Sequence, residues 1–317
     1  MTKTLLISKR LPKSVLEAAR DRFDATLRET EDSMTEAEVT AALEQYDMIL
    51  PTLGDQFTGA AINAAKDPRC GLIANFGVGY NHIDAAAASS RGIAVTNTPG
   101  AVTDATADIA LMLILMTARR AGEGERMLRA GEWVGWQPTQ MLGMHISGKT
   151  VGIIGMGRIG QAIAHRCRAG FGCKIVFANR SEKSVEGATQ LASPAAVAEA
   201  ADIVVIATPG GAETRHLIDA AFFDAMQSHA ILVNISRGDV IDEAAMISAL
   251  EDGLIAGAGL DVYEQEPVVP DALIAMENVT LLPHLGTAAL EVRQDMGNMA
   301  LANVIAFAEG RELPNPV

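Results

Sequence analysis

The sequence predicts an α/β protein with two doubly wound parallel sheets, and three observations lead to this fold class. Short apolar runs alternate with helical segments through the first hundred residues, as in parallel strands joined by crossover helices. The alternation stops at Thr98, Pro99 and Gly100, and a long helical segment follows. A second alternating series begins at Lys149, so the two halves are predicted to be separate α/β units.

The first half contains four predicted strands, at residues 5–7, 48–50, 72–74 and 93–95. Segments of helical composition separate them, at residues 14–20, 36–44 and 60–65. The long helix after Pro99 is predicted to span residues 103–130. Asp104 and Asp108 fall in its first turns, where carboxylates favour the positive end of the helix dipole.

The second half contains six predicted strands, at residues 150–154, 174–178, 203–207, 231–235, 258–260 and 279–282. Helical segments separate most of them, at residues 159–169, 195–200, 220–226 and 243–251. A last helix is predicted at residues 288–308. Six strands with intervening helices are enough for a complete doubly wound sheet.

The bulk composition excludes several classes of function. With 317 residues, 49% of them hydrophobic, the chain can bury a full core in each of two domains. Its 25 basic and 39 acidic residues give a net charge of −14, which disfavours binding to nucleic acid or to an anionic membrane. The three cysteines lack C-x-x-C spacing and are expected to be reduced thiols, and no metal site is predicted. Because no apolar stretch suits a signal peptide or a membrane span, we expect a cytoplasmic protein.

The stretch Gly155-Met-Gly157-Arg-Ile-Gly160 lies between a predicted strand and a predicted helix. Alone, this G-x-G-x-x-G spacing is a weak signal, but the strand before it and the helix after it favour a dinucleotide site. Glycines there allow a tight turn and let the backbone approach a pyrophosphate at the helix N-terminus. The alternative is that the glycines serve strand–helix packing only.

Arg237 follows a predicted strand in the stretch LVNISRGDVID. Its guanidinium is therefore expected at the carboxyl end of a strand, the edge at which doubly wound sheets bind ligands. A planar group with a permanent charge suits a carboxylate, which it can bind through two parallel hydrogen bonds. On local spacing alone, an exposed loop arginine is the simpler interpretation.

An acid and a histidine also follow predicted strands, in the stretches GLDVYEQEP (259–267) and LLPHLG (281–286). A carboxylate beside the imidazole of His284 would stabilise its protonated form and make it a proton donor near neutral pH. Most histidines are not catalytic. The hypothesis therefore depends on finding the acid, His284 and Arg237 at strand ends of one sheet beside a dinucleotide turn.

Together these stretches resemble the D-2-hydroxyacid dehydrogenase family, and within it the glyoxylate and hydroxypyruvate reductase branch. GIIGMGRIGQAIA, NISRGDVID, GAGLDVYEQEP and PHLGTA occur in this order, and the resemblance covers essentially the whole chain. It implies a flavodoxin-like substrate-binding domain of residues 1–99 with 288–317, and a Rossmann cofactor domain of residues 100–287. It also implies a homodimer.

The resemblance implies catalytic roles for three residues. Arg237 would bind the carboxylate and carbonyl oxygen of the substrate, His284 would protonate that oxygen as hydride arrives, and Glu266 would hold the imidazole. Substrate contacts are also implied for Leu53, Gly54, Val78 and Gly79. Val78 and Gly79 would act through their backbone amides.

A larger set of residues is implied to contact the dinucleotide. Asp261 and Thr103 match residues near the nicotinamide carboxamide in this family. The full set is Thr103, Gly155, Gly157, Arg158, Ile159, Gly160, Asn179, Arg180, Ser181, Thr208, Pro209, Ile235, Asp261, His284 and Gly286.

The stretch FANRSE (177–182) bears on the choice of dinucleotide. In relatives that use NAD, the position of Asn179 is typically Asp, which accepts from both ribose hydroxyls and repels a 2′-phosphate. Asn179 removes that repulsion, while Arg180 adds a charge and Ser181 a hydroxyl suited to phosphate. With Lys183 as a second cation, the stretch predicts a preference for NADP(H) over NAD(H). Glu182 opposes this interpretation, and a polar loop that serves NAD(H) is the alternative.

We therefore expect an NADPH-dependent reductase of small 2-keto acids such as glyoxylate and hydroxypyruvate. Glu266 argues against a formate dehydrogenase, in which Gln stands at the matching position. Two alternatives stay open. One is an NAD-dependent dehydrogenase of another 2-hydroxy acid, and the other is a non-enzymatic corepressor that binds the dinucleotide with the same fold.

Overall fold

The computed structural model describes residues 2–317, and these residues form two compact units. One unit extends to Val102 and includes Ala288–Val317, and the other is Thr103–Thr287. The sequence placed the first boundary after residue 99, three residues earlier. Val102 is buried and still belongs to the first unit, and the next helix begins at Thr103.

The first unit contains a sheet of five parallel strands. Its strands are β1 (Thr4–Ile7), β2 (Asp24–Leu27), β3 (Met48–Leu50), β4 (Leu72–Ala74) and β5 (Ala94–Thr96). They lie in the order β2-β1-β3-β4-β5, which is the flavodoxin-like order and confirms the predicted fold class. β2 was not predicted, because its side chains are exposed or half-buried and form no apolar run.

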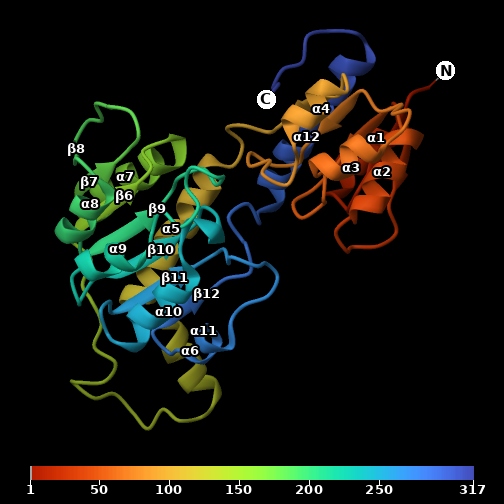
Figure 1. Ribbon diagram of the computed structural model, residues 1–317. Coiled ribbons are helices and arrows are strands. Elements are labelled where there is room, and N and C mark those ends of the chain that lie inside the picture. The colour runs from red at the N-terminus through yellow and green to blue at the C-terminus, as the bar shows by residue number, and fades with distance from the viewer. Residues whose placement is uncertain (1) are drawn as a thin grey trace. The chain divides into compact units, whose positions relative to one another are not determined.

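Figure 1 shows the helices of this unit, and their packing against the core places them on both faces of the sheet. They are α1 (Lys13–Arg20), α2 (Glu36–Gln45), α3 (Gly59–Ala64), α4 (Ala85–Ser90) and α12 (Leu290–Ala308). Alternate residues of a strand point to opposite faces: Leu5 and Ile7 pack in the core with α1 and α12, and Leu6 packs with α2, α3 and α4. The last helix, α12, thereby completes a unit that begins nearly 290 residues earlier in the chain.

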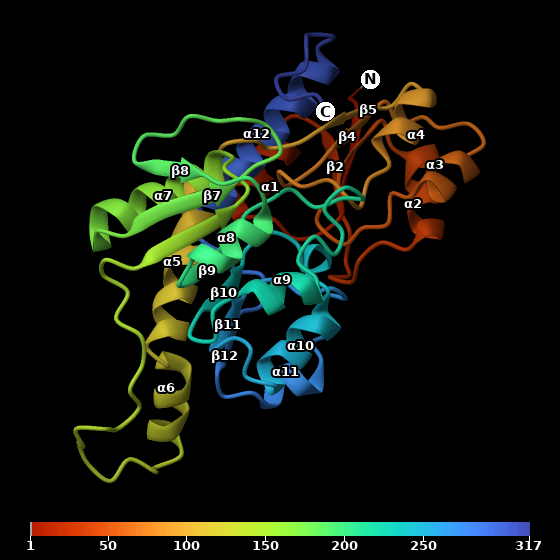
Figure 2. The same cartoon turned by 60° about the vertical axis from the view of Figure 1, so that its left-hand side comes forward.

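The second unit contains a sheet of seven parallel strands, which can be followed in Figure 2. They are β6 (Thr150–Ile154), β7 (Lys174–Ala178), β8 (Ala188–Gln190), β9 (Ile203–Ile206), β10 (Ile231–Asn234), β11 (Gly257–Leu260) and β12 (Val279–Leu281). Their order is β12-β11-β10-β9-β6-β7-β8, a Rossmann arrangement whose direction reverses between β6 and β9. The reversal creates the crevice at which such sheets bind ligands.

Two helical layers enclose the second sheet. Helices α5 (Thr103–Ala118) and α7 (Arg158–Phe171) pack on one face, with Leu113, Ile163 and Phe177 in the shared core. The other face is covered by α8 (Pro194–Ala200), α9 (Ala220–Ala225) and α10 (Glu243–Glu251), and α11 (Asp271–Ala275) adds Leu273 to that core. None of the helices in residues 2–317 is long and apolar enough to cross a membrane.

The long helix predicted over residues 103–130 is instead two helices, so this expectation was wrong. α5 ends at Ala118, and α6 (Ala121–Arg129) begins after Arg120, whose φ of 54° is left-handed. The Met144 amide donates to the Ala118 carbonyl at 2.7 Å, and Arg120 binds Glu123 through two nitrogens at 2.8 and 2.6 Å. These contacts cap the first helix and fix the start of the second.

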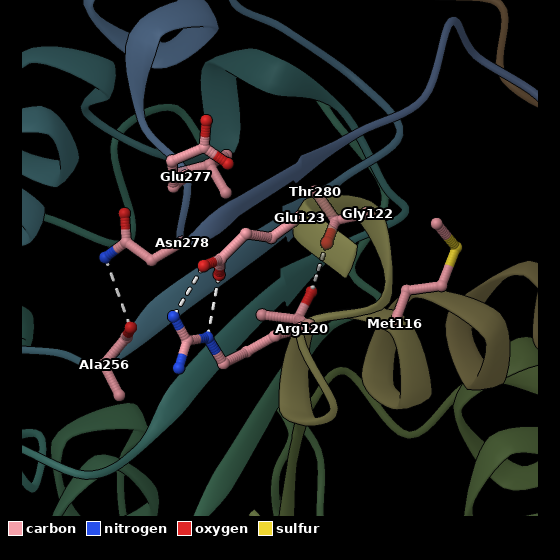
Figure 3. A pocket seen from close by; sticks show the side chains of 10 residues that line it. Met116, Arg120, Gly122, Glu123, Ala256, Glu277, Asn278 and Thr280 are labelled. Atoms are coloured by element: carbon pink, nitrogen blue, oxygen red, sulfur yellow. Dashed lines mark hydrogen bonds and ion pairs between the residues drawn. The ribbon is translucent and has the colours of Figure 1, made fainter. Parts of the chain in front are cut away.

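A pocket of about 340 Å³ lies at this junction and is drawn in Figure 3. It is lined by the last turn of α5 and the first turn of α6, which includes Glu123. Residues just before or within β11 and β12 complete it, among them Glu277 and Asn278. It is thus at the amino ends of the strands. None of the residues with a predicted catalytic or cofactor role lines it.

Candidate active site

Three glycines shape the turn between β6 and α7. Gly155 has a φ of +98°, and a Cβ atom there would lie 2.7 Å from the Ala207 carbonyl oxygen. A Cβ on Gly160 would lie 2.2 Å from the Gly155 carbonyl oxygen, so the helix and the turn approach closely only because both residues are glycine. By contrast, a Cβ on Gly157 would meet no atom within 4 Å, which leaves open space at the middle of the turn.

This turn fits the diphosphate of a dinucleotide. α7 begins at Arg158, so Arg158 and Ile159 lie in the first turn of a 14-residue helix, where free N–H groups favour an anion. The open space at Gly157 lets such an anion approach the backbone. Beside the turn, the hydroxyl of Thr208 is buried and makes no hydrogen bond to any of residues 2–317, so it is available to a ligand.

The loop after β7 is tied to the glycine-rich turn through Met156. The Asn179 carboxamide oxygen accepts from the Met156 amide at 3.2 Å, and the Lys183 ammonium donates to the Met156 carbonyl at 2.9 Å. The Asn179 amide nitrogen donates to the Ser181 carbonyl at 2.9 Å and reaches its hydroxyl at 3.1 Å. Asn179 therefore shapes the loop, and Lys183 is engaged by the backbone.

Arg180 projects from the same loop and forms an ion pair with Glu213. The side chain of Arg180 is 87% exposed and that of Glu213 79% exposed. Glu213 belongs to the segment after β9, which also contains Thr208 and Pro209. The cation expected to meet a 2′-phosphate is thus balanced by an acid that the sequence analysis did not consider.

Arg237 is held at the carboxyl end of β10 by its own turn. Asn234, which is 1% exposed, donates to the Arg237 carbonyl at 3.0 Å and accepts from the Ser236 amide and hydroxyl, each at 3.0 Å. Burial lowers the pKa of Arg237, and the charges of Glu266 and Asp239 act against that shift. A half-buried guanidinium next to two acids stays charged and suits an anion, and one of its nitrogens donates to the Ser236 carbonyl at 2.7 Å. Asn234 was missed, although an Asn at a strand end just before the arginine turn could have identified it.

Glu266 and His284 form a hydrogen-bonded pair. The His284 Nδ1 atom lies 2.8 Å from Glu266 Oε2, and each side chain is 30% exposed. Burial acts to raise the pKa of Glu266, but the hydrogen bond and charge of His284, the Tyr263 amide and the charge of Arg237 together lower it. The carboxylate therefore stays ionised and leaves Nε2 of the imidazole for another partner.

Asp261 fixes the backbone around His284. Its carboxylate accepts from the Leu285 amide at 2.6 Å and the Gly286 amide at 2.8 Å, while its carbonyl accepts from the His284 amide at 2.9 Å. These bonds hold His284 at a φ of 54°, a left-handed conformation that is uncommon outside glycine. Burial raises the pKa of Asp261, against the effect of the two amides and of His284.

Tyr263 connects the segments that carry all three candidate catalytic residues. Its amide donates to Glu266 at 3.1 Å, and its hydroxyl donates to the Leu282 carbonyl at 2.9 Å, two residues before His284. A Cβ added to Gly238, next to Arg237, would lie 1.8 Å from the Tyr263 carbonyl carbon. The sequence analysis missed Tyr263, because nothing in its spacing distinguishes it from a core aromatic residue.

The remaining residues that the resemblance implies as cofactor contacts fall around the same edge of the sheet. Pro209 accepts from the Thr214 hydroxyl at 2.8 Å, and Ile235 is 7% exposed at the end of β10. The Gly286 carbonyl accepts from Thr106 at 3.2 Å in the first turns of α5, the helix that begins at Thr103.

In the first unit, the loop after β4 has its carbonyl groups engaged by neighbouring side chains. Asn75 donates to the Gly77 and Gly79 carbonyls at 3.0 and 3.1 Å, and Asn97 donates to the Val78 carbonyl at 2.9 Å. The loop after β3 contains Leu53, 39% exposed, whose carbonyl accepts from Lys9 at 3.4 Å, and Gly54, with a φ of 95°. The substrate contacts expected at these two loops remain predictions.

Comparison with known proteins shows to which protein family the chain is related. Residues 111–286 match the model of the "D-isomer specific 2-hydroxyacid dehydrogenase, NAD binding domain". A glyoxylate reductase of Thermococcus kodakarensis is 39% identical over an alignment that covers 100% of this chain and 96% of that protein. The chain belongs to the D-isomer specific 2-hydroxyacid dehydrogenase family. It is therefore an enzyme of that family, and its second unit contains the family's nicotinamide dinucleotide-binding domain.

Solved structures of family members have the same fold. A D-isomer specific 2-hydroxyacid dehydrogenase from a Polaromonas species superposes with a TM-score of 0.93 at 36% identity and 100% coverage of both chains. An NADPH-dependent glyoxylate/hydroxypyruvate reductase of Sinorhizobium meliloti, solved with NADP and malonate, has a TM-score of 0.90 at 36% identity. That comparison covers 100% of this chain and 97% of the other. The predicted resemblance to the glyoxylate and hydroxypyruvate reductase branch is thereby confirmed.

Proposed function

We propose that this enzyme reduces small 2-keto acids, glyoxylate and hydroxypyruvate among them, to 2-hydroxy acids with NADPH as the preferred hydride donor. The observation that carries the proposal is the His284–Glu266 pair, joined at 2.8 Å at the same sheet edge as Arg237 and the glycine-rich turn. The glyoxylate reductases among its relatives support the choice of substrate.

Gly155, Gly157 and the first turn of α7 would hold the dinucleotide, which when bound would supply the hydride. Arg237 binds the carboxylate and the carbonyl oxygen of the keto acid, since a half-buried permanent charge attracts both. His284 delivers the proton from Nε2 to that oxygen. The developing negative charge is thus stabilised first by Arg237 and then by protonation.

Glu266 has two functions in this scheme. It accepts the hydrogen bond from His284 Nδ1, which fixes the ring orientation and directs Nε2 to the substrate. Its charge also stabilises the imidazolium before the proton is transferred. In the first unit, the amides of Val78 and Gly79 are proposed to bind the substrate carboxylate, and Leu53 and Gly54 to limit substrate size.

The proposed preference for NADPH rests on the loop after β7. Asn179 presents no negative charge, and Ser181 and Arg180 are exposed donors. A 2′-phosphate would gain charge-assisted hydrogen bonds from both. In this proposal, Arg180 exchanges its ion pair with Glu213 for the phosphate.

Initial rates of NADPH and NADH oxidation, measured in parallel with glyoxylate and with hydroxypyruvate, test this function. We expect turnover with both acids and a clear NADPH preference. Equal rates with NADPH and NADH would refute the cofactor preference but not the reaction. Dinucleotide binding without turnover of either acid would favour a dehydrogenase of another 2-hydroxy acid, or a binding protein without activity.

A further inference from the structure

Gln190 is a half-buried residue at the end of β8, outside the predicted set of cofactor residues. β8 is the edge strand of the second sheet, and Gln190 lies opposite Phe177 in the register with β7. The strand register therefore brings its side chain beside the loop that follows β7, residues 179–183.

The single carboxamide of Gln190 makes three hydrogen bonds to the backbone of this loop. Its oxygen accepts from the Lys183 amide at 2.8 Å, and its nitrogen donates to the carbonyls of Asn179 at 3.3 Å and Ser181 at 3.2 Å. Both hydrogens of the amide nitrogen are thereby used. No other side chain in residues 2–317 binds three backbone groups of this loop.

Fixing these two carbonyls also fixes two amides. In a trans peptide the C=O and N–H groups point in opposite directions. With the Asn179 and Ser181 carbonyls directed at Gln190, the N–H groups of Arg180 and Glu182 point away from it. Neither of these amides donates a hydrogen bond to any of residues 2–317, so both are available to a ligand.

We propose that Gln190 is a positioning residue for dinucleotide specificity, because it directs the Arg180 and Glu182 amides into a backbone cradle for the 2′-phosphate. Backbone N–H groups that point into one concavity bind anions, and the amides of Arg180 and Glu182 lie two residues apart on this loop. The side chains of this loop offer little free positive charge, because Arg180 is paired with Glu213 and Lys183 donates to the Met156 carbonyl. The cradle adds two neutral backbone donors at this place. This inference rests on the proposed NADPH preference and assigns part of that preference to the backbone.

Two variants separate the hydrogen bonds of Gln190 from its shape. Gln190→Met keeps the length of the side chain and removes all three bonds. Gln190→Glu keeps the acceptor for the Lys183 amide but cannot donate to the two carbonyls. Gln227→Met is the matched control, since Gln227 also donates to a backbone carbonyl, that of Glu199 at 3.0 Å, but lies before β10 at the amino edge of the sheet.

Calorimetric titration of adenosine 2′,5′-bisphosphate and of adenosine 5′-monophosphate measures the effect without turnover. We expect Gln190→Met to weaken binding of the bisphosphate by roughly 5- to 20-fold and binding of the monophosphate by less than about twofold. The difference arises because the hydrogen bonds lost are those from the loop amides to the charged 2′-phosphate. Gln190→Glu should lose at least as much affinity for the bisphosphate, while hydrogen exchange should show that its Lys183 amide is still protected. Gln227→Met should match the parent.

The outcomes distinguish this inference from the cofactor proposal. A parent enzyme that binds the two nucleotides equally overturns both. A parent that prefers the bisphosphate, and keeps that preference in Gln190→Met, overturns the role of Gln190 alone. Equal weakening of both nucleotides would show that Gln190 only supports the fold, and would also overturn the inference.

Discussion

The two ends of the candidate site in the second unit are built in different ways. At the catalytic end, Arg237 and His284 are half-buried, and the surrounding backbone is held by Asn234, Asp261 and Tyr263. At the loop after β7, Arg180 is exposed and its charge is balanced by a similarly exposed Glu213. Under the proposed function, the chemistry is therefore fixed by the fold, whereas dinucleotide choice depends on a few polar groups that can be exchanged at little cost to stability.

Replacing His284 tests the catalytic end of the site most directly. His284→Ala should lower turnover by roughly 10²- to 10⁴-fold, because it removes the proton donor. Because His284 is also among the residues expected to contact the dinucleotide, dinucleotide affinity is measured in parallel by titration calorimetry, and turnover should fall far more than affinity does. His229→Ala is a matched control: His229 pairs with Asp202 at 2.7 Å but lies before β10, at the amino edge of the sheet. Parental turnover in His284→Ala would refute the proposed mechanism.

Glu266→Gln should have the next largest effect. It removes the charge that holds the His284 Nδ1 atom at 2.8 Å, so we expect turnover to fall by roughly 10- to 100-fold. The kcat-against-KM split is the decisive measurement, because loss of the oriented proton donor lowers kcat, and an unchanged kcat with a raised KM would contradict this role of Glu266.

The same substitution has a signature in stability. The pKa of Glu266 in the folded enzyme is below its ordinary value of 4.5, so the ionised group stabilises the fold above that pH and the contribution is lost as the pH falls. The neutral amide introduced by Glu266→Gln makes no such contribution. The difference in Tm between the parent and Glu266→Gln should therefore be largest near neutral pH and shrink below about pH 4.5. A difference that grows on acidification would contradict the sign of the shift.

At the loop after β7, Asn179→Asp should reverse part of the proposed preference for NADPH over NADH. An aspartate would place a negative charge near the 2′-phosphate and a second acceptor against the Ser181 carbonyl, where Asn179 now donates at 2.9 Å. We expect kcat/KM with NADPH to fall by roughly 10-fold, while that with NADH holds or rises. Asn278→Asp adds the same charge just before β12, at the other edge of the sheet, and should leave the ratio unchanged.

The fold could be predicted from the sequence wherever a strand is buried, and not at the edges. Ten strands have apolar runs that marked them, but β2 and β8 present exposed or half-buried side chains and resemble loops. Missing β8 also hid Gln190, because its contacts to the loop exist only through the register with β7. The break after Ala118 was equally hidden, since it depends on contacts to Glu123 and Met144.

Arg237 and His284 could be expected at one edge because a doubly wound sheet gathers the carboxyl ends of its strands there, whereas the choice of Glu266 and the three catalytic roles came from the resemblance to the family. The resemblance implied a cofactor contact for Asp261, but its bonds to the Leu285 and Gly286 amides could not be predicted, and Tyr263 was missed, because both residues act through backbone groups that a sequence does not place. The ion pair between Arg180 and Glu213 could not be predicted from the sequence either. Glu213 is 33 positions away and follows a different strand, so only the structure brings the two charges together.

Glu213→Gln should produce the smallest effect and the most specific one. An exposed ion pair contributes about 0–1 kcal/mol, so freeing Arg180 should strengthen binding of NADPH by roughly two- to fivefold and leave NADH unchanged. Because such pairs are screened by salt, the gain should be larger at low ionic strength and should shrink toward about 1 M salt. Weaker NADPH binding by Glu213→Gln would instead mean that Glu213 holds Arg180 in place for the phosphate, and the loop would then be as firmly built as the catalytic end.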